Sequence, residues 1–165
     1  MATTSSKLPA PLTRFVGREA ELAEATALLA EGRLLTVTGP GGAGKTRLAL
    51  RLASAVAEQF RDGAWFVDLS PLSGGEFVWD QVAMTLGVRE PGRGKTVAEA
   101  ASRYLASRRA LVVLDNCEHV VEAAAEVTAG LLAAAPRLKI IATSREPLEV
   151  GGEVTWSVPP LSESD

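Results

Sequence analysis

The run GPGGAGKT at residues 39–46 constrains the fold of this 165-residue chain more than any other feature. It follows RLLTVTG, a short, apolar and β-branched segment that is typical of a buried strand. It leads into KTRLALRLASAVAEQF, where Leu48, Leu52 and Val56 recur at helical spacing. The sequence therefore predicts a strand, a glycine-rich loop and a helix, in that order.

This loop matches the pattern G-x-x-x-x-G-K-[ST] in the strand-to-helix context that the pattern requires. Glycines allow successive N–H groups to point inward at phosphate oxygens, and the helix that follows adds the partial positive charge of its N-terminus. We expect Lys45 to reach the β- and γ-phosphates of a nucleotide and Thr46 to place its hydroxyl on Mg²⁺. The predicted phosphate-binding residues are Gly39, Pro40, Gly41, Gly42, Ala43, Gly44, Lys45, Thr46 and Arg47.

A second Gly-Lys-Thr, in EPGRGKT at residues 90–96, does not meet the same requirement. The first glycine of the eight-residue pattern would fall at Arg89, and the preceding TLGVREP is typical of a helix end and a turn. We interpret this segment as a solvated loop.

Apolar strand-like segments alternate with helix-like segments through the rest of the chain. Continuous apolar runs such as LVVL suit strands that are covered on both faces, as in a parallel sheet. The predicted fold class is therefore α/β, a parallel sheet with helices on both faces. The expected helices cover residues 18–30, 45–60, 77–88, 97–107 and 120–135, and the expected strands cover residues 33–39, 64–69, 110–115, 138–144 and 153–158.

The ends, charge and cysteine content bound the domain organisation and the compartment. Residues 1–13 are rich in Ser, Thr and Pro and are predicted to form a flexible leader before one nucleotide-binding domain at 14–165. A net charge of −3 gives no general attraction to nucleic acid or anionic membranes. Cys117 is the only cysteine, and neither a signal peptide nor an apolar run of about 18 residues is present. We expect a cytoplasmic domain with no membrane contact and no direct nucleic-acid binding.

The segment ALVVLDNCEH carries a second candidate group. An apolar strand that ends in Asp115 would deliver this carboxylate to the edge of the sheet where the glycine loop lies, as a ligand for Mg²⁺. Glu118 is a candidate for polarising an attacking water, although a carboxylate in a first helical turn also stabilises the helix N-terminus. We interpret Cys117 and His119 as packing or surface residues, because no partners at metal-ligand spacing accompany them.

A third candidate is Arg145, directly after the strand-like segment LKIIATS. If this strand lies near the preceding one in the sheet, the guanidinium would project toward the γ-phosphate and stabilise its charge. The alternative interpretation is an ordinary surface arginine.

Four segments in this order, RFVGREAEL, VTGPGGAGKTRLAL, LVVLDNCEHV and IIATSREPL, resemble the nucleotide-binding core of the STAND (NB-ARC-like) ATPases. The resemblance is strongest to large bacterial transcriptional regulators of the LuxR and antibiotic-regulatory types and covers roughly residues 12–161. It implies a P-loop NTPase core of the ASCE type that acts as an ATP/ADP-dependent switch in signal transduction. The roles that it implies are adenine and ribose contacts for Val16, Gly17 and Arg18, phosphate and Mg²⁺ contacts for Lys45, Thr46 and Asp115, and γ-phosphate sensing for Arg145.

The sequence departs from this family in two respects. Many relatives have a second acidic residue directly after the Mg²⁺ aspartate, whereas this chain has Asn116, which argues against rapid hydrolysis and makes Glu118 the substitute candidate. The helical and winged-helix domains that follow the core in the family are absent after Asp165. We therefore expect an isolated core, either excised from a longer protein or naturally short. Its expected interactions are with further domains of a longer parent protein and within a nucleotide-dependent oligomer.

These features predict an ATP/ADP-binding switch domain with slow Mg²⁺-dependent ATP hydrolysis, in which Lys45, Asp115, Glu118 and Arg145 are the catalytic candidates. A GTPase is not expected, because the chain has no Asn-Lys-x-Asp motif. Two alternatives remain open at this point. One is a nucleotide-binding module without turnover, and the other is a small-molecule kinase.

Overall fold

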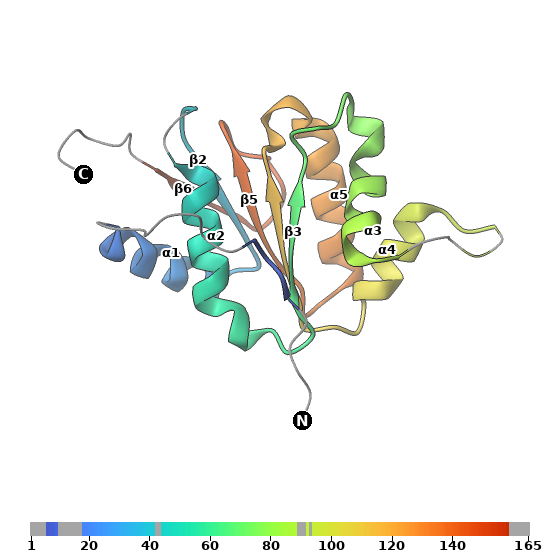
Figure 1. The fold of residues 1–165 in the computed structure, drawn as a ribbon, viewed down its shortest axis with the longest axis horizontal. Coiled ribbons are helices and arrows are strands. Elements are labelled where there is room, and N and C mark those ends of the chain that lie inside the picture. The colour runs from blue at the N-terminus through green and yellow to red at the C-terminus, as the bar shows by residue number, and fades with distance from the viewer. Residues whose placement is uncertain (1–5, 10–17, 42–43, 89–91, 93, 159–165) are drawn as a thin grey trace.

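A single parallel sheet forms the centre of the molecule (Figure 1). The computed structural model describes residues 6–9, 18–41, 44–88, 92 and 94–158. The strand order is β1-β3-β4-β5-β2-β6, and every neighbouring pair is parallel. The strands are β1 (Ser6–Lys7), β2 (Leu34–Thr38), β3 (Ala64–Asp68), β4 (Leu111–Asp115), β5 (Lys139–Ser144) and β6 (Glu153–Ser157).

Helices cover both faces of this sheet. Alternate residues of β4 show the division, because Val112 and Leu114 belong to the core under one set of helices and Leu111 and Val113 to the core under the other. Figure 1 shows α1 and α2 on one side of the sheet and α3, α4 and α5 on the other. The helices are α1 (Glu19–Glu31), α2 (Lys45–Val56), α3 (Val78–Leu86), α4 (Val97–Leu105) and α5 (Val121–Ala134), with three short 3-10 helices, η1 (Ala57–Gln59), η2 (Gly75–Phe77) and η3 (Cys117–His119).

The predicted α/β class, with a parallel sheet and helices on both faces, is confirmed. Strand β5 lies between β2, which leads into the glycine loop, and β4, which ends in Asp115. Strand β1 was not predicted: Ser6 and Lys7, inside the segment expected to be a loose leader, pair with β3. None of the helices among the described residues has the length and apolar character needed to cross a membrane.

The second Gly-Lys-Thr has a structural use that differs from phosphate binding. Lys95 and Thr96 are exposed, and the element before them is α3 rather than a strand. The Thr96 hydroxyl accepts a hydrogen bond from the Glu99 amide at 3.1 Å and so caps the N-terminus of α4. Among the described residues of this segment, 92 and 94–96, none lies in a helix or a strand, so the interpretation as a loop is confirmed for these residues.

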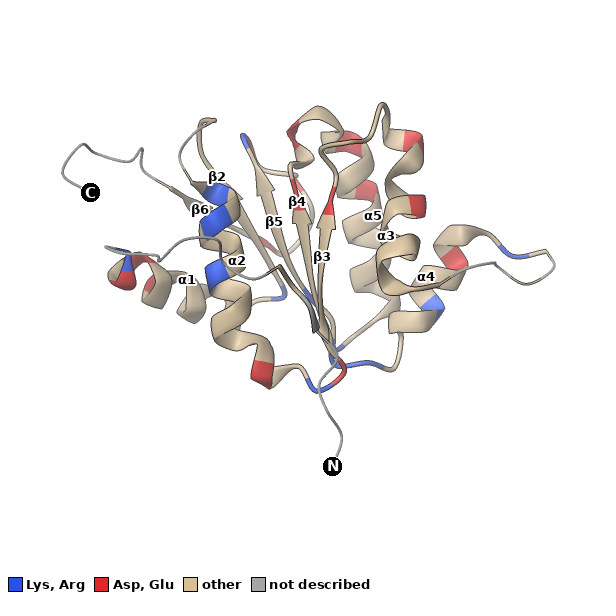
Figure 2. Cartoon of the chain, in the orientation of Figure 1, with Lys and Arg blue, Asp and Glu red and all other residues tan. Residues whose placement is uncertain are grey.

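Because the strands are parallel, they all end at one edge of the sheet and all begin at the other. The carboxyl edge is where β2, β3, β4 and β5 end, at Thr38, Asp68, Asp115 and Ser144. The amino edge is where the same strands begin, at Leu34, Ala64, Leu111 and Lys139. Figure 2 shows acidic residues at the ends of β3 and β4 on the carboxyl edge and basic residues on the loops of the amino edge.

Basic side chains at the amino edge stabilise the C-terminal ends of helices. Arg33 donates to the carbonyl of Ala135, the C-cap of α5, and to that of Leu138, just before β5. Lys139 donates to the carbonyls of Leu29 and Ala30 in the last turn of α1. Neither helix has a basic residue in its own last turn, so cations distant in sequence meet these carbonyl groups. The same end of each helix carries the negative pole of its dipole, which a cation stabilises.

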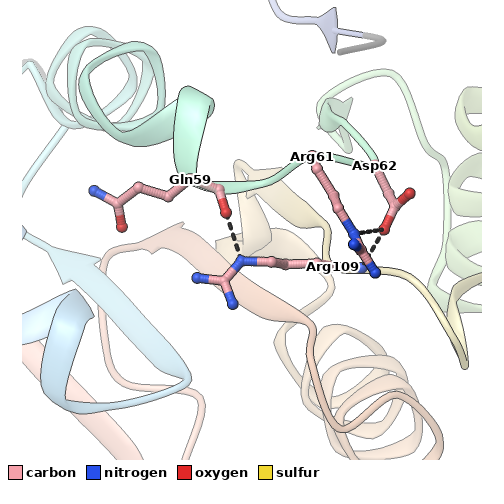
Figure 3. A network of polar contacts seen from close by, with 4 residues as sticks. All are labelled: Gln59, Arg61, Asp62 and Arg109. Atoms are coloured by element: carbon pink, nitrogen blue, oxygen red, sulfur yellow. Dashed lines mark hydrogen bonds and ion pairs between the residues drawn. The ribbon is translucent and has the colours of Figure 1, made fainter. Parts of the chain in front are cut away.

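Arg109 connects two segments at this edge, as Figure 3 shows. Its Nε donates to the carbonyl of Gln59, the last residue of η1, at 2.5 Å, and its amide donates to Asp62 Oδ2 at 2.7 Å. Arg61 lies 3.6 Å from the same carboxylate, but its side chain is 71% exposed, so this ion pair contributes little to stability. Burial and the neighbouring Arg109 and Arg33 lower the pKa of Lys139, which indicates how closely these cations gather.

Candidate functional site

The N-terminus of α2 differs from that of the other helices. Among the described α-helices, α1, α3, α4 and α5 each carry an acidic residue in the first turn, whereas α2 carries none and begins with Lys45. A cation at the positive end of a helix dipole is unfavourable for the helix itself. Gly44, the N-cap, has a φ of 83°, a left-handed conformation that favours glycine. The helix therefore begins at a glycine that supplies no side-chain cap, followed by a lysine, an arrangement suited to an anion.

Lys45 is folded into the glycine loop. Its side chain is only 8% exposed, and Nζ donates to the carbonyls of Gly39 at 2.8 Å and Pro40 at 3.2 Å. Both carbonyls belong to the loop that the lysine follows. The ammonium group is thus held at the loop, where a bound phosphate would replace these carbonyl contacts with charge-assisted ones.

Thr46 and Asp115 lie in direct contact, although they are 69 residues apart in sequence. The Thr46 hydroxyl donates to the Asp115 carboxylate, at 2.8 Å from Oδ1 and 3.1 Å from Oδ2. Helix α2 supplies one group and the end of β4 the other. Two of the predicted Mg²⁺ ligands therefore meet beside the glycine loop.

Asp115 is 2% exposed and is held by a network of donors. Thr143 of β5 donates to Oδ1 at 2.7 Å, and the Asn116 side chain donates to Oδ2 at 2.9 Å. Asn116 has a left-handed backbone, and its amide donates to the Thr143 hydroxyl at 2.9 Å. The sequence analysis did not identify Thr143, whose only signal was a polar residue near the end of a buried strand.

Burial raises the pKa of the Asp115 carboxyl above its usual range. Hydrogen bonds from Thr143 and Thr46 act in the opposite direction, and the charges of Asp68 and Glu118 raise the pKa further. Asp68, which ends β3 and pairs in register with Asp115, is a second residue that the sequence analysis missed. A buried carboxylate with acidic neighbours is an environment that a cation would stabilise.

The oxygen groups of this cluster fit Mg²⁺. A carboxylate and a hydroxyl in contact are the ligand types that Mg²⁺ takes, usually together with waters and substrate phosphates. No group of three or more His, Cys, Asp or Glu residues capable of holding a metal occurs in the described part of the chain. The hydroxyl and carboxylate in contact suit a cation that also binds phosphate oxygens.

Glu118 lies in η3, close enough to raise the pKa of Asp115 through its charge. Its side chain is half-buried, and Oε2 is buried without a hydrogen-bond partner among the described residues. Cys117 beside it is fully buried, and burial raises the pKa of its thiol far above the usual range, so this thiol is inert.

Arg145 reaches from the end of β5 toward the glycine loop. The residue is exposed, and its Nη2 lies 3.3 Å from where a Cβ on Gly41 would stand. The strand before Arg145 was required to lie near the strand that ends in Asp115, and β5 is indeed the direct neighbour of β4 in the sheet. Its guanidinium thus lies over the loop that is predicted to bind phosphate.

The other predicted nucleotide contacts are described only in part. Arg18 is buried at the N-cap of α1, and Arg47 is exposed in the first turn of α2. A cavity of about 510 Å³ lies between α3 and α4, lined in part by Asp80 and Met84, and none of the predicted site residues lines it. Four predicted nucleotide contacts lie outside the described residues: Val16, Gly17, Gly42 and Ala43.

Comparisons with known proteins agree with this geometry. A family model described as AAA domain matches residues 29–144, which is more than half of the chain. The protein named "Putative HTH-type transcriptional regulator Rv0890c", from Mycobacterium tuberculosis, is 47% identical over 140 residues, or 84% of this chain and 15% of that protein. Regulatory protein AfsR of Streptomyces coelicolor is 32% identical over 134 residues, or 71% of this chain and 14% of that protein. The chain thus spans only about 15% of the length of such relatives.

Solved structures share the fold. A Signal Transduction ATPase with Numerous Domains (STAND) protein with a tetratricopeptide repeat sensor, from Pyrococcus horikoshii, has a TM-score of 0.63 at 16% identity, covering 97% of this chain and 25% of that chain. The Aeropyrum pernix ORC2 protein in its ADP form has a TM-score of 0.58 at 17% identity, covering 89% of this chain and 50% of that one. At these identities the likeness establishes the fold, that of a P-loop NTPase core.

Proposed function

Because the chain belongs to the AAA domain family, we propose that it is an ATP/ADP-binding switch that hydrolyses ATP slowly with Mg²⁺. The contact between the Thr46 hydroxyl and the buried Asp115 carboxylate is the observation that carries this proposal. It joins the glycine loop to the acidic end of β4, where a cation bound to phosphate would be needed.

Different residues at the carboxyl edge are proposed to bind different parts of the nucleotide and its Mg²⁺. The amides at the start of α2 and the Lys45 ammonium bind the phosphates, after Lys45 has exchanged its contacts with the Gly39 and Pro40 carbonyls. Thr46 and Asp115 would hold Mg²⁺, which would supply positive charge at the phosphate oxygens. Val16, Gly17 and Arg18 bind the adenine and ribose, and Arg47 adds charge at the phosphates.

Glu118 is the proposed general base for hydrolysis. Its Oε2 is buried and accepts no hydrogen bond from the described residues, so this oxygen keeps its lone pairs for a proton from an attacking water that would enter with the nucleotide. Asn116 instead donates to Asp115, which a carboxylate at the same position could not do, so it holds the Mg²⁺ ligand rather than activating water. With one half-buried carboxylate for this step, and with Asn116 rather than an acid directly after Asp115 in the sequence, turnover is expected to be slow.

Arg145 is the proposed sensor of the γ-phosphate. Its guanidinium lies beside Gly41 in the glycine loop, and it is held by a strand end rather than by the loop itself. A contact to the γ-phosphate exists with ATP and is lost with ADP, so the conformation after β5 would depend on the nucleotide.

In its biological setting, the domain is proposed to be the nucleotide-binding core of a signal-transducing, cytoplasmic transcriptional regulator of the STAND type. The names and lengths of the relatives support this proposal, because the chain matches only a small part of each regulator. Other domains of such a protein would bind DNA and receive the signal. This core would contribute nucleotide binding and a nucleotide-dependent oligomer, with no membrane contact.

One observation favours a second candidate, a nucleotide-binding module without turnover. Asn116 satisfies Asp115 and removes the acidic neighbour that hydrolysis in many relatives relies on. Phosphate release measured alongside nucleotide affinity separates the two candidates.

Calorimetric titration with ATP and ADP in Mg²⁺ tests the proposal. Lys45→Ala is expected to weaken both nucleotides about 100-fold or more, because charge-assisted contacts to two phosphates disappear. Lys95→Ala, in the second Gly-Lys-Thr, is the matched control and should bind as the wild type does. Equal affinity in Lys45→Ala and the wild type, or a loss confined to Lys95→Ala, would overturn the assignment.

A further inference from the structure

The carboxylate of Glu153, at the start of β6, accepts three hydrogen bonds from two other parts of the chain. The Thr36 hydroxyl donates to Oε2 at 2.6 Å, and the Leu148 amide donates to the same oxygen at 2.8 Å. The Glu149 amide donates to Oε1 at 3.0 Å. Both oxygens of one half-buried carboxylate are therefore engaged, and charge-assisted hydrogen bonds of this kind are among the stronger ones in proteins.

Leu148 and Glu149 belong to the loop of residues 145–152, which joins β5 to β6 and begins with Arg145. Glu149 has a φ of 63°, a left-handed conformation that is uncommon for a residue other than glycine, asparagine or aspartate. Such a conformation persists when neighbouring contacts over-determine it. The bond from the Glu149 amide to Glu153 is a contact that holds the loop in this shape.

Thr36 connects the same carboxylate to the glycine loop. It is fully buried in the middle of β2, and Gly39 begins the glycine loop three residues later. Glu153 thus ties the strand that leads into the glycine loop to the loop that carries Arg145. At the far end of this connection, Arg145 Nη2 lies 3.3 Å from the Cβ position of Gly41.

We propose that Glu153 is a positioning residue for Arg145: its carboxylate fixes the loop after β5 relative to β2, and so sets how strongly the domain distinguishes ATP from ADP. This inference rests on the proposed role of Arg145 as a γ-phosphate sensor. Glu153 acts through the backbone of residues 148 and 149 and is not a catalytic residue. Without its carboxylate, two loop amides and the Thr36 hydroxyl lose a common acceptor, and the guanidinium is no longer held over the glycine loop.

The ratio of affinities for a non-hydrolysable ATP analogue and ADP, measured by calorimetry, tests the inference. Glu153→Ala should reduce the preference for the analogue over ADP by about threefold to tenfold. This is part of the affinity that a charged hydrogen bond from Arg145 to the γ-phosphate would contribute. Glu153→Gln keeps one acceptor oxygen for Leu148 and Thr36 but offers an NH₂ group to the Glu149 amide, so its ratio should lie between those of the wild type and Glu153→Ala. Glu149→Gln also removes one negative charge, but it keeps the backbone amide that donates to Glu153, so it should leave the affinity ratio unchanged.

Two further results decide between positioning and general stabilisation. In a chain that already carries Arg145→Ala, adding Glu153→Ala should change the ratio no further, because the two residues act through one contact. A Glu153 variant that unfolds more easily yet keeps the wild-type ratio of affinities would overturn the inference and leave Glu153 a structural residue. Equal losses of affinity for both nucleotides would do the same. If Glu153→Ala does not fold, the ratio in Glu153→Gln decides in the same way. Failure of the proposed function has a separate signature, since the wild-type chain itself would then bind neither nucleotide.

Discussion

The two edges of the sheet use basic residues in opposite ways. At the amino edge, Arg33 and Lys139 donate to carbonyl groups at the C-terminal ends of α5 and α1, and Arg109 donates to the carbonyl that ends η1. At the carboxyl edge, Lys45 stands at the N-terminal end of α2, and Arg145 is exposed over the glycine loop. Cations at the first edge meet the negative poles of helices, whereas Lys45 meets a positive one.

The contrast distinguishes basic residues that stabilise the fold from basic residues that bind ligands in a fold of this type. A parallel sheet with crossover helices brings helix C-termini to the amino edge and helix N-termini to the carboxyl edge. A basic residue at the amino edge is therefore expected to contribute to the free energy of unfolding and to be silent in ligand binding. A basic residue at the carboxyl edge is expected to show the reverse.

The largest expected effect concerns ATP hydrolysis at the carboxyl edge. Asp115→Ala should abolish phosphate release, because the proposed Mg²⁺ site loses its carboxylate, and Glu118→Gln should lower it. The wild-type rate itself should be well below ~10 s⁻¹, the middle of the usual enzyme range. Asp80→Ala, which removes an exposed carboxylate from α3, is the control and should hydrolyse ATP at the wild-type rate. Unchanged phosphate release in Asp115→Ala would contradict the assignment.

The next effect sharpens the comparison of the arginines. Arg145→Ala should weaken binding of an ATP analogue about tenfold and leave ADP nearly unaffected, since a charged hydrogen bond contributes roughly 1.5 to 3 kcal/mol. Arg137→Ala, an exposed arginine just before β5 at the amino edge, should change neither affinity. Equal losses for both nucleotides in Arg145→Ala would make it a structural residue, and the sensor role would have to be abandoned.

A smaller effect follows from the raised pKa of Asp115. Burial favours the protonated carboxyl in the folded state, so the native state is penalised once the pH exceeds the unfolded pKa of about 3.9, and fully so above the folded pKa. Asp115→Asn keeps an oxygen that can accept from Thr46 and Thr143 and removes the buried charge. It should raise the free energy of unfolding at pH 7, a gain that disappears as the pH falls toward 4.

Denaturant unfolding of Asp115→Asn and the wild type at both pH values checks this sign. Comparing the two proteins at the same pH cancels contributions from the remaining carboxyl groups. A variant that is less stable at pH 7, or a gain that is equal at pH 7 and pH 4, would show that the carboxylate is not strained by its burial.

The sequence predicted the elements because their signals are local. Helical spacing in KTRLALRLASAVAEQF and apolar runs such as LVVL depend only on nearby residues, and α2 and β4 follow them closely. Strand β1 was missed because two residues carry no periodic signal, and their pairing with β3 is set by tertiary contacts. Likewise, Gln59 ends the short η1 segment after α2, a distinction that helical spacing does not make.

The candidate site was predicted where one segment carries a whole pattern. Lys45, Thr46 and Asp115 could be named because each lies in a motif. Thr143 and Glu153 could not, because their importance comes from bonds across strands, to Asp115 and to Thr36. Asn116 was identified only as a departure from a family pattern, and the bond from its side chain to Asp115 required the structure.

Nucleotide affinity and the free energy of unfolding, measured together on Lys45→Ala and Arg33→Ala, test the contrast between the edges most directly. Lys45→Ala should lose nucleotide binding while keeping or slightly raising its stability, because a cation leaves a helix N-terminus. Arg33→Ala should lose about 1 to 3 kcal/mol of stability, because the carbonyls of Ala135, at the end of α5, and Leu138, before β5, lose their donor. It should bind nucleotide as the wild type does. If Lys45→Ala were destabilised with its affinity intact, or if Arg33→Ala lost affinity without losing stability, the account of the two edges would be wrong.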